Sequence, residues 1–116
     1  MKMILELIES GRSGWFSGKG FKAARHKNHE EAIEFFKLAL KHSTSEYDPV
    51  LYDSMAFSYY NLGNLSEAFV CAERSIKEYL ELKDPEKENP DTDRRIGALQ
   101  ELVIRIKSKN THTTKR

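Results

Sequence analysis

The sequence contains few of the residues that interrupt helices or cross-link chains. Its 116 residues include six glycines, three prolines and a single cysteine, Cys71. One cysteine cannot form an internal disulfide or a cysteine-based zinc site, which favours a reducing compartment, so we expect a cytoplasmic protein. With 32% charged and 39% hydrophobic residues, so little proline and glycine is typical of a soluble, all-α domain.

A strong net charge and a long apolar run are both absent. The 19 Lys and Arg residues balance 18 Asp and Glu residues, which favours neither a nucleic acid nor an acidic membrane as a partner. Residues 1–9 are mostly apolar but include two glutamates, and they are much shorter than the ~20 apolar residues that span a bilayer. We therefore expect no membrane partner and assign residues 1–9 to the folded domain.

One local pattern occurs twice, 36 residues apart. Asn28–Ala32 and Asn64–Ala68 each begin with an asparagine that can cap a helix, and a glutamate follows three residues later. This capping-box arrangement predicts a helix start at each asparagine. Small and large residues then recur on one face of each helix, as antiparallel helix pairs require. The two faces consist of Ala32, Phe36, Ala39 and Leu40, and of Ala68, Ala72, Ser75, Ile76 and Tyr79.

Each of these helices has a predicted helical partner upstream. Asp48 followed by Pro49 predicts a helix start, and apolar residues then continue at helical spacing to the turn at Gly63. The corresponding helix of the first unit, at about residues 15–26, contains glycines that each cost ~1 kcal/mol relative to alanine. These glycines, Gly14, Gly18 and Gly20, predict a flexible start to the first hairpin.

A last helix is predicted after the polar segment that contains Pro85 and Pro90. It covers about residues 92–107 and carries one narrow apolar stripe, formed by Ile96, Leu99, Val103 and Ile106. Residues 111–116 contain no apolar anchor and are predicted to be a disordered tail.

The two units resemble tetratricopeptide repeats, whose pattern is W-x2-L-G-x2-Y followed by A-x3-F. The second unit reads Tyr52, Met55, Ala56, Tyr59 and Ala68 at these positions, and the weaker first unit reads Phe16, Lys19, Gly20, Ala23, Ala32 and Phe36. The resemblance implies antiparallel hairpins stacked as an α–α superhelix of about five to six helices. The implied single domain covers residues 1–110, with repeats at about 14–44 and 48–83 and a capping helix at about 92–107.

Members of this family usually bind a partner's peptide in a concave groove, and the resemblance implies a non-catalytic adaptor of this kind. The implied groove residues are Phe21, Ala24 and Arg25 in the first unit, and Asp53, Ser54, Phe57, Tyr60 and Asn61 in the second. Some members hold a chaperone's C-terminal carboxylate with Lys and Asn side chains. The matching positions here are Ser17, Phe21 and Ser54, so we expect a different peptide. Whether Phe57 and Tyr60 belong to the groove or to the core stays open.

The sequence leaves two alternatives to the adaptor. Two repeats are fewer than the ~3 that usually make a stable array, so the chain could form a homo-oligomer through the apolar segment Met1–Ile8. A small enzyme would need a convergent acid, base or metal cluster. The lone Cys71 reads as a buried small side chain, His26 and His29 have no third ligand nearby, and the glycine-rich segment Ser13–Gly20 follows no strand. We therefore predict no catalysis, no metal and no cofactor.

The C-terminal part of the chain is basic but has no aromatic residues among its cations. We interpret it as a solvated helix end and not as a nucleic-acid site, because such sites combine cations with aromatic stacking platforms. The cations are Arg94, Arg95, Arg105, Lys107, Lys109, Lys115 and Arg116.

Overall fold

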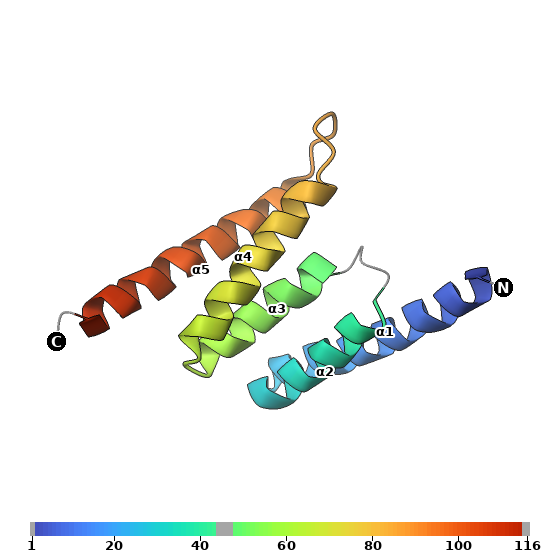
Figure 1. Cartoon of the computed structure of the whole chain (residues 1–116), viewed down its shortest axis with the longest axis horizontal. Helices are drawn as coiled ribbons and strands as arrows, with labels where there is room; N and C mark the ends of the chain where they lie inside the picture. Colours follow the sequence, from blue (N-terminus) through green and yellow to red (C-terminus); the bar gives the residue numbers. More distant parts are fainter. Residues whose placement is uncertain (1, 44–47, 115–116) are drawn as a thin grey trace.

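The described part of the chain is entirely helical in its regular structure (Figure 1). The computed structural model describes the backbone of residues 2–43 and 48–114, and the side chains of residues 11–43 and 48–109. The helices are α1 (Lys2–Arg25), α2 (His29–Lys41), α3 (Asp48–Asn61), α4 (Leu65–Leu82) and α5 (Pro90–Thr114). The predicted all-α fold of five to six helices is confirmed.

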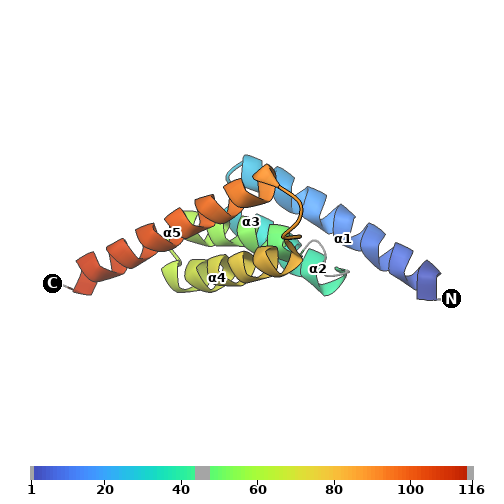
Figure 2. The same cartoon turned by 90° about the horizontal axis from the view of Figure 1, so that it is seen from above.

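Each helix packs on the next one along the chain. α1 and α2 form one hairpin, α3 and α4 form a second, and α5 lies against α4. α3 also packs on α2, and it contacts both α1 and α5. α2 and α4 lie on one side of the array, opposite α1 and α5 (Figure 2). We call the surface to which α1, α3 and α5 contribute the odd-helix face.

The turns inside the two hairpins have the same backbone geometry, 36 residues apart. In the first, the N–H of Asn28 donates to the carbonyl of Ala23 at 2.9 Å, and in the second the N–H of Asn64 donates to Tyr59 at 2.9 Å. These bonds close a Schellman motif, which needs one residue with positive φ. Lys27 takes that role with φ 63° and Gly63 with φ 82°. The repeated sequence pattern therefore corresponds to a repeated turn.

A serine hydroxyl joins the same two positions in each hairpin. In the first hairpin Ser13 Oγ donates to the carbonyl of Ala39 at 2.9 Å, whereas in the second Ser75 Oγ donates to the carbonyl of Pro49 at 2.6 Å. Ser13 and Pro49 are equivalent positions, as are Ala39 and Ser75, so the donor and acceptor helices have exchanged roles. Both bonds are buried, where a hydrogen bond satisfies groups that would otherwise be costly to desolvate.

Gly20 allows the first hairpin to close around a buried aromatic ring. A Cβ atom on Gly20 would lie 2.6 Å from Cε1 of Phe36, which is 0% exposed. In the second hairpin the equivalent pair is Ala56 with Ala72, both also fully buried. The predicted flexible start at the glycines is wrong, because α1 is continuous through Gly14, Gly18 and Gly20. Packing on α2 outweighs the low helix propensity of these residues.

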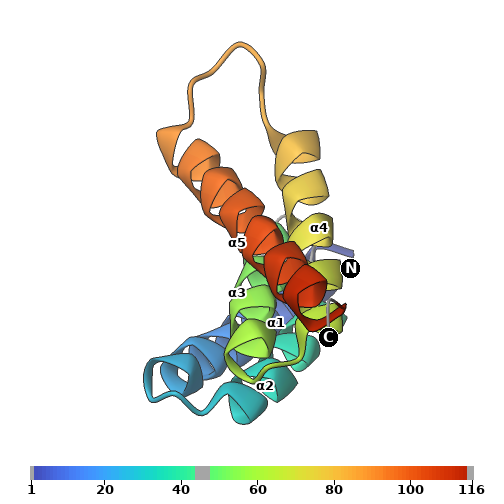
Figure 3. The ribbon, with the colours of Figure 1, turned by 90° about the vertical axis from the view of Figure 1, so that its left-hand side faces the viewer.

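α5 covers the end of the array with the predicted apolar stripe. Its residues Ile96, Leu99, Val103 and Ile106 are buried, and Leu102 is buried with them. The loop that precedes α5 projects at one end of the molecule, with the α1–α2 hairpin at the other end (Figure 3). α5 continues to Thr114, so residues 111–114, predicted to be disordered, are helical. A helix that has been nucleated by packing extends at low cost, one residue at a time.

Two further predictions concern the ends of elements. The predicted helix starts are confirmed, since Asn28 and Asn64 are the N-cap residues of α2 and α4. The side chain of Asn64 accepts a hydrogen bond from the N–H of Glu67, whereas the side chain of Asn28 makes no cap bond. Glu30 and Glu31 still place favourable negative charge in the first turn of α2. The side chains of Met1–Ile8, which the homo-oligomer alternative would use for self-association, lie outside the described residues.

Candidate functional site

Asp53, predicted to line a peptide groove, is buried beneath α5 with 2% of its surface exposed. Arg95 on α5 donates two hydrogen bonds to the Asp53 carboxylate, from Nε to Oδ2 at 2.7 Å and from Nη2 to Oδ1. The Tyr79 hydroxyl on α4 donates to Oδ2 at 3.1 Å. Three helices therefore meet at one carboxylate. Asp53 therefore does not line an open groove, because α5 folds back over α3 and Arg95 covers the carboxylate.

The electrostatics of this cluster favour a structural role. Burial raises the pKa of the Tyr79 hydroxyl, and the adjacent Asp53 charge raises it further. The hydrogen bond to Asp53 raises the pKa of Arg95. Both side chains therefore stay protonated near neutral pH and act as donors to a carboxylate. These hydrogen bonds join α3, α4 and α5 at one acceptor.

Two of the predicted groove aromatics are partly covered by cations of α5. The Arg95 guanidinium lies 5.6 Å from the centroid of the Phe57 ring, and Lys109 Nζ lies 4.5 Å from the centroid of Tyr60. Both rings are half-buried and pack against the core. These cation–π contacts connect both rings to α5.

The remaining groove residues are more open. On α1, Phe21 is 37% exposed, packs edge-to-face on Phe36 with centroids 5.2 Å apart, and is followed by half-buried Ala24 and exposed Arg25. On α3, Asn61 is exposed, and half-buried Ser54 donates to the carbonyl of Val50 in its own helix at 3.0 Å. The accessible part of the predicted groove therefore lies along α1 and the neighbouring side of α3.

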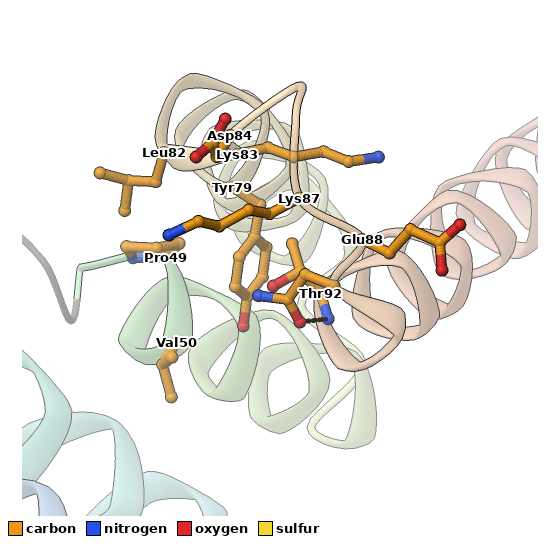
Figure 4. A pocket seen from close by; sticks show the side chains of 10 residues that line it. Pro49, Val50, Tyr79, Leu82, Lys83, Asp84, Lys87, Glu88 and Thr92 are labelled. Atoms are coloured by element: carbon orange, nitrogen blue, oxygen red, sulfur yellow. Dashed lines mark hydrogen bonds between the residues drawn. The ribbon is translucent and has the colours of Figure 1, made fainter.

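A pocket of about 340 Å³ lies where the start of α3, the end of α4 and the loop before α5 meet. The Tyr79 ring lies at the centre of its lining, and the Glu88 carboxylate and the Lys83 amino group point away from it (Figure 4). Lys83 is paired with Asp93 at 2.7 Å, and the N–H of Thr92 donates to Asn89 Oδ1 at 3.1 Å. The lining combines the apolar residues Pro49, Val50 and Leu82 with polar and charged residues of the loop.

The candidate catalytic and metal-binding residues of the sequence do not form a cluster in the structure. Cys71 is buried, and burial raises the pKa of its thiol to about 11, with the Glu67 charge adding to the rise. The thiolate, which is the reactive form, is therefore scarce at neutral pH. His26 is exposed and His29 is half-buried. Within the described residues no three His, Cys, Asp or Glu side chains are grouped as a metal site would need.

The outer surface of α1 is a feature that the sequence predictions missed. Trp15 is 58% exposed, with Lys19 Nζ 4.8 Å from its ring centroid, and Lys22 is exposed one turn farther along. Gly11 and Gly18 lie on the same side of the helix, and a Cβ atom on either would meet nothing within 4 Å. Two signals were present in the sequence. The glycines recur at helical spacing, and no acidic residue occurs between Glu9 and Glu30.

Comparison of the chain with known protein families, curated proteins and solved structures found no match. The described helices also include none that is both long enough and apolar enough to cross a bilayer.

Proposed function

We propose that this chain is a non-catalytic, tetratricopeptide-like module of the cytoplasm that binds a segment of another protein. The repeated turns and repeated serine bonds, 36 residues apart, support a relationship to helical repeat proteins. In such arrays each unit packs on its neighbours and leaves an extended surface for partners. A binding role without catalysis is consistent with the Asp53 cluster, in which Tyr79 and Arg95 both donate hydrogen bonds to the carboxylate.

The proposed binding surface is the open part of the odd-helix face, and exposed Phe21 is the observation that carries it. Phe21 occupies the position in α1 that Phe57 occupies in α3, but it has no cation of α5 over it. Aromatic side chains at the centre of an interface contribute much of its binding energy. Arg25 and Asn61, equivalent positions at the C-terminal ends of α1 and α3, add polar groups that can orient a peptide backbone.

The test uses peptides selected on the intact protein from a random display library. Phe21→Ala combined with Asn61→Ala should weaken the selected peptides by roughly tenfold or more, because the anchor ring and an orienting amide are both removed. Val70→Ala combined with Leu80→Ala removes exposed apolar side chains from α4 and is the matched control.

Circular dichroism and the melting temperature of both double variants verify that the helices remain folded. Equal peptide affinity for the wild type and the Phe21/Asn61 variant would place the binding surface elsewhere and overturn this assignment. Loss of affinity in the Val70/Leu80 variant would place it on α4.

A further inference from the structure

The outer surface of α1 corresponds to the surface of α3 that α2 covers. Residues 36 positions after Trp15, Lys19 and Lys22 are Leu51, Met55 and Ser58, which are only 1%, 4% and 2% exposed. The hairpins share their internal geometry, and they differ in that α2 packs on α3, whereas no second helix of the described residues packs as extensively on α1 as α2 does. α3 packs on α2 more extensively than on α1 or α5, so we infer that α2 contributes most to the burial of these three positions. On the equivalent side of α1, the described residues leave a helix-packing surface exposed.

The residues on this surface, which we call the α1 end face, have a distinct chemistry. The α1 end face consists of Gly11, Trp15, Gly18, Lys19 and Lys22, all of them exposed. The two glycines leave open space above the backbone, so another helix can approach more closely than it could over larger side chains. Trp15 is a large apolar ring on a surface where the second hairpin has aliphatic residues. The two lysines replace Met55 and Ser58 with positive charge.

Charge complementarity identifies the kind of partner. Residues 11–25 of α1 carry the cations Arg12, Lys19, Lys22 and Arg25 and no acidic residue, so the surface that they form attracts negative charge. A second copy of this chain is a poor match for end-to-end stacking. The described part of α5, at the other end of the array, is also basic, with five cations against three acidic residues. Like charges juxtaposed at such a contact oppose association.

The aromatic rings favour a protein helix over a nucleic acid. Single strands bind where successive rings offer free faces for stacking. Here Phe16 is stacked on His42 with centroids 5.7 Å apart, and Phe21 packs on Phe36. Trp15 is the most exposed of these three rings, and its ring contacts are with Phe16 and Lys19 of its own helix. One large exposed ring suits a single anchor inserted between the side chains of a packed helix.

We propose that the α1 end face binds an acidic amphipathic helix of another protein, in the position relative to α1 that α2 takes relative to α3. The apolar ridge of that helix packs on Trp15 and over Gly11 and Gly18, and its flanking Glu or Asp side chains pair with Lys19 and Lys22. This second surface is separate from the peptide surface around Phe21 and does not depend on it.

The only tryptophan of the chain reports directly on this surface. The probe is a synthetic amphipathic helix of about four turns with Leu and Ala on one face and Glu on both flanks, a length comparable to α2. Its titration should shift Trp15 emission to shorter wavelength, reach saturation, and weaken as salt is added. The same peptide with Lys in place of Glu should leave the emission unchanged.

Charge reversal provides the decisive variant. Lys19→Glu with Lys22→Glu should weaken the acidic peptide by roughly tenfold or more and allow the lysine peptide to bind, because attraction and repulsion are exchanged. Lys37→Glu with Lys41→Glu reverses two exposed lysines on α2 and is the matched control, expected to bind like the wild type. Circular dichroism verifies that all variants are folded.

The proposal fails if no probe shifts the emission, if the Lys19/Lys22 variant binds the acidic peptide as tightly as the wild type does, or if a single-stranded oligonucleotide or anionic vesicles bind more tightly than the acidic helix. The Phe21/Asn61 variant should keep this response, and the Lys19/Lys22 variant should keep the library-selected peptides. Failure at one surface is therefore distinguishable from failure at the other.

Discussion

The two hairpins share a backbone and differ in the side chains that hold it. Their turns and their buried serine bonds occupy equivalent positions. Inside, the first hairpin pairs a glycine with a phenylalanine, whereas the second pairs two alanines. Outside, the second hairpin lies between α2 and α5, whereas the first has α1 open on its outer side. Equivalent geometry can thus be reached with different side chains, because a glycine on one helix leaves room for a large ring on the other.

The polar contacts differ in the same way. Asp53 and Tyr79 of the second hairpin are joined with Arg95 of α5, while the equivalent positions of the first hairpin carry Ser17 and Ser43. Ser17 donates to the carbonyl of Ser13 in its own helix at 2.7 Å. The Asp53 carboxylate accepts hydrogen bonds from α4 and α5, whereas the Ser17 hydroxyl donates within its own helix. The contact with α5 therefore depends on an acidic residue of the second hairpin, and the first hairpin has a serine at the equivalent position.

The largest expected effect comes from removing the cation that fixes α5 to the second hairpin. Arg95→Ala should lower the free energy of unfolding by about 3 kcal/mol, because it leaves the buried Asp53 carboxylate without its charged partner. Urea unfolding followed by circular dichroism measures the change. Arg94→Ala is the matched control. Arg94 and its partner Asp91 are 75% and 85% exposed, so its loss should cost less than about 0.5 kcal/mol. Equal losses in the two variants would show that the Asp53 cluster does not hold α5.

The glycine and phenylalanine contact of the first hairpin is tested by two alanine substitutions on α1. Gly20→Ala should destabilise the protein by about 2 kcal/mol, because the new methyl group would overlap the buried Phe36 ring. Gly18→Ala meets open space and should stabilise α1 by about 0.5 to 1 kcal/mol through its higher helix propensity. Thermal unfolding compares the two. Stabilisation by both substitutions would mean that the Phe36 ring moves aside at little cost.

The smallest expected effect distinguishes the two turns. Lys27→Gly should raise the free energy of unfolding by about 1 kcal/mol, since glycine adopts positive φ without the Cβ clash that lysine has. Gly63→Ala should lower it by about 1 kcal/mol for the converse reason. If each substitution moves the urea midpoint in the stated direction, the two turns are equivalent in energy as well as in geometry. Opposite shifts would contradict the assignment of strain to Lys27.

Much of the helical framework could be predicted from the sequence because it follows from local patterns. The repeat marked by Ala32 and Ala68 predicted two hairpins, and the stripe at Ile96 and Leu99 predicted the buried face of α5. The start of α1 was missed because glycines dominated the local signal. Their effect is small compared with the packing of a whole helix face.

The binding surface was predicted less well, for a reason visible at Asp53. Its position within α3 is compatible with a groove, and only the return of α5 places Arg95 upon it. One signal pointed in this direction. No Lys or Arg occurs between Lys41 and Arg74, so a buried Asp53 needs a cation that is distant in sequence. The exposure of Trp15 could not be predicted from the sequence, because it depends on which helices pack beside α1.

The sequence by itself determined the helical class, the two hairpins and their turns, since caps, breakers and apolar spacing act over a few residues. The tertiary structure decided which faces are covered. It buried Asp53 under Arg95, placed cations of α5 over Phe57 and Tyr60, and left Trp15 with the lysines beside it exposed. Covering a face requires a contact between distant segments, and such contacts are set by how whole helices stack.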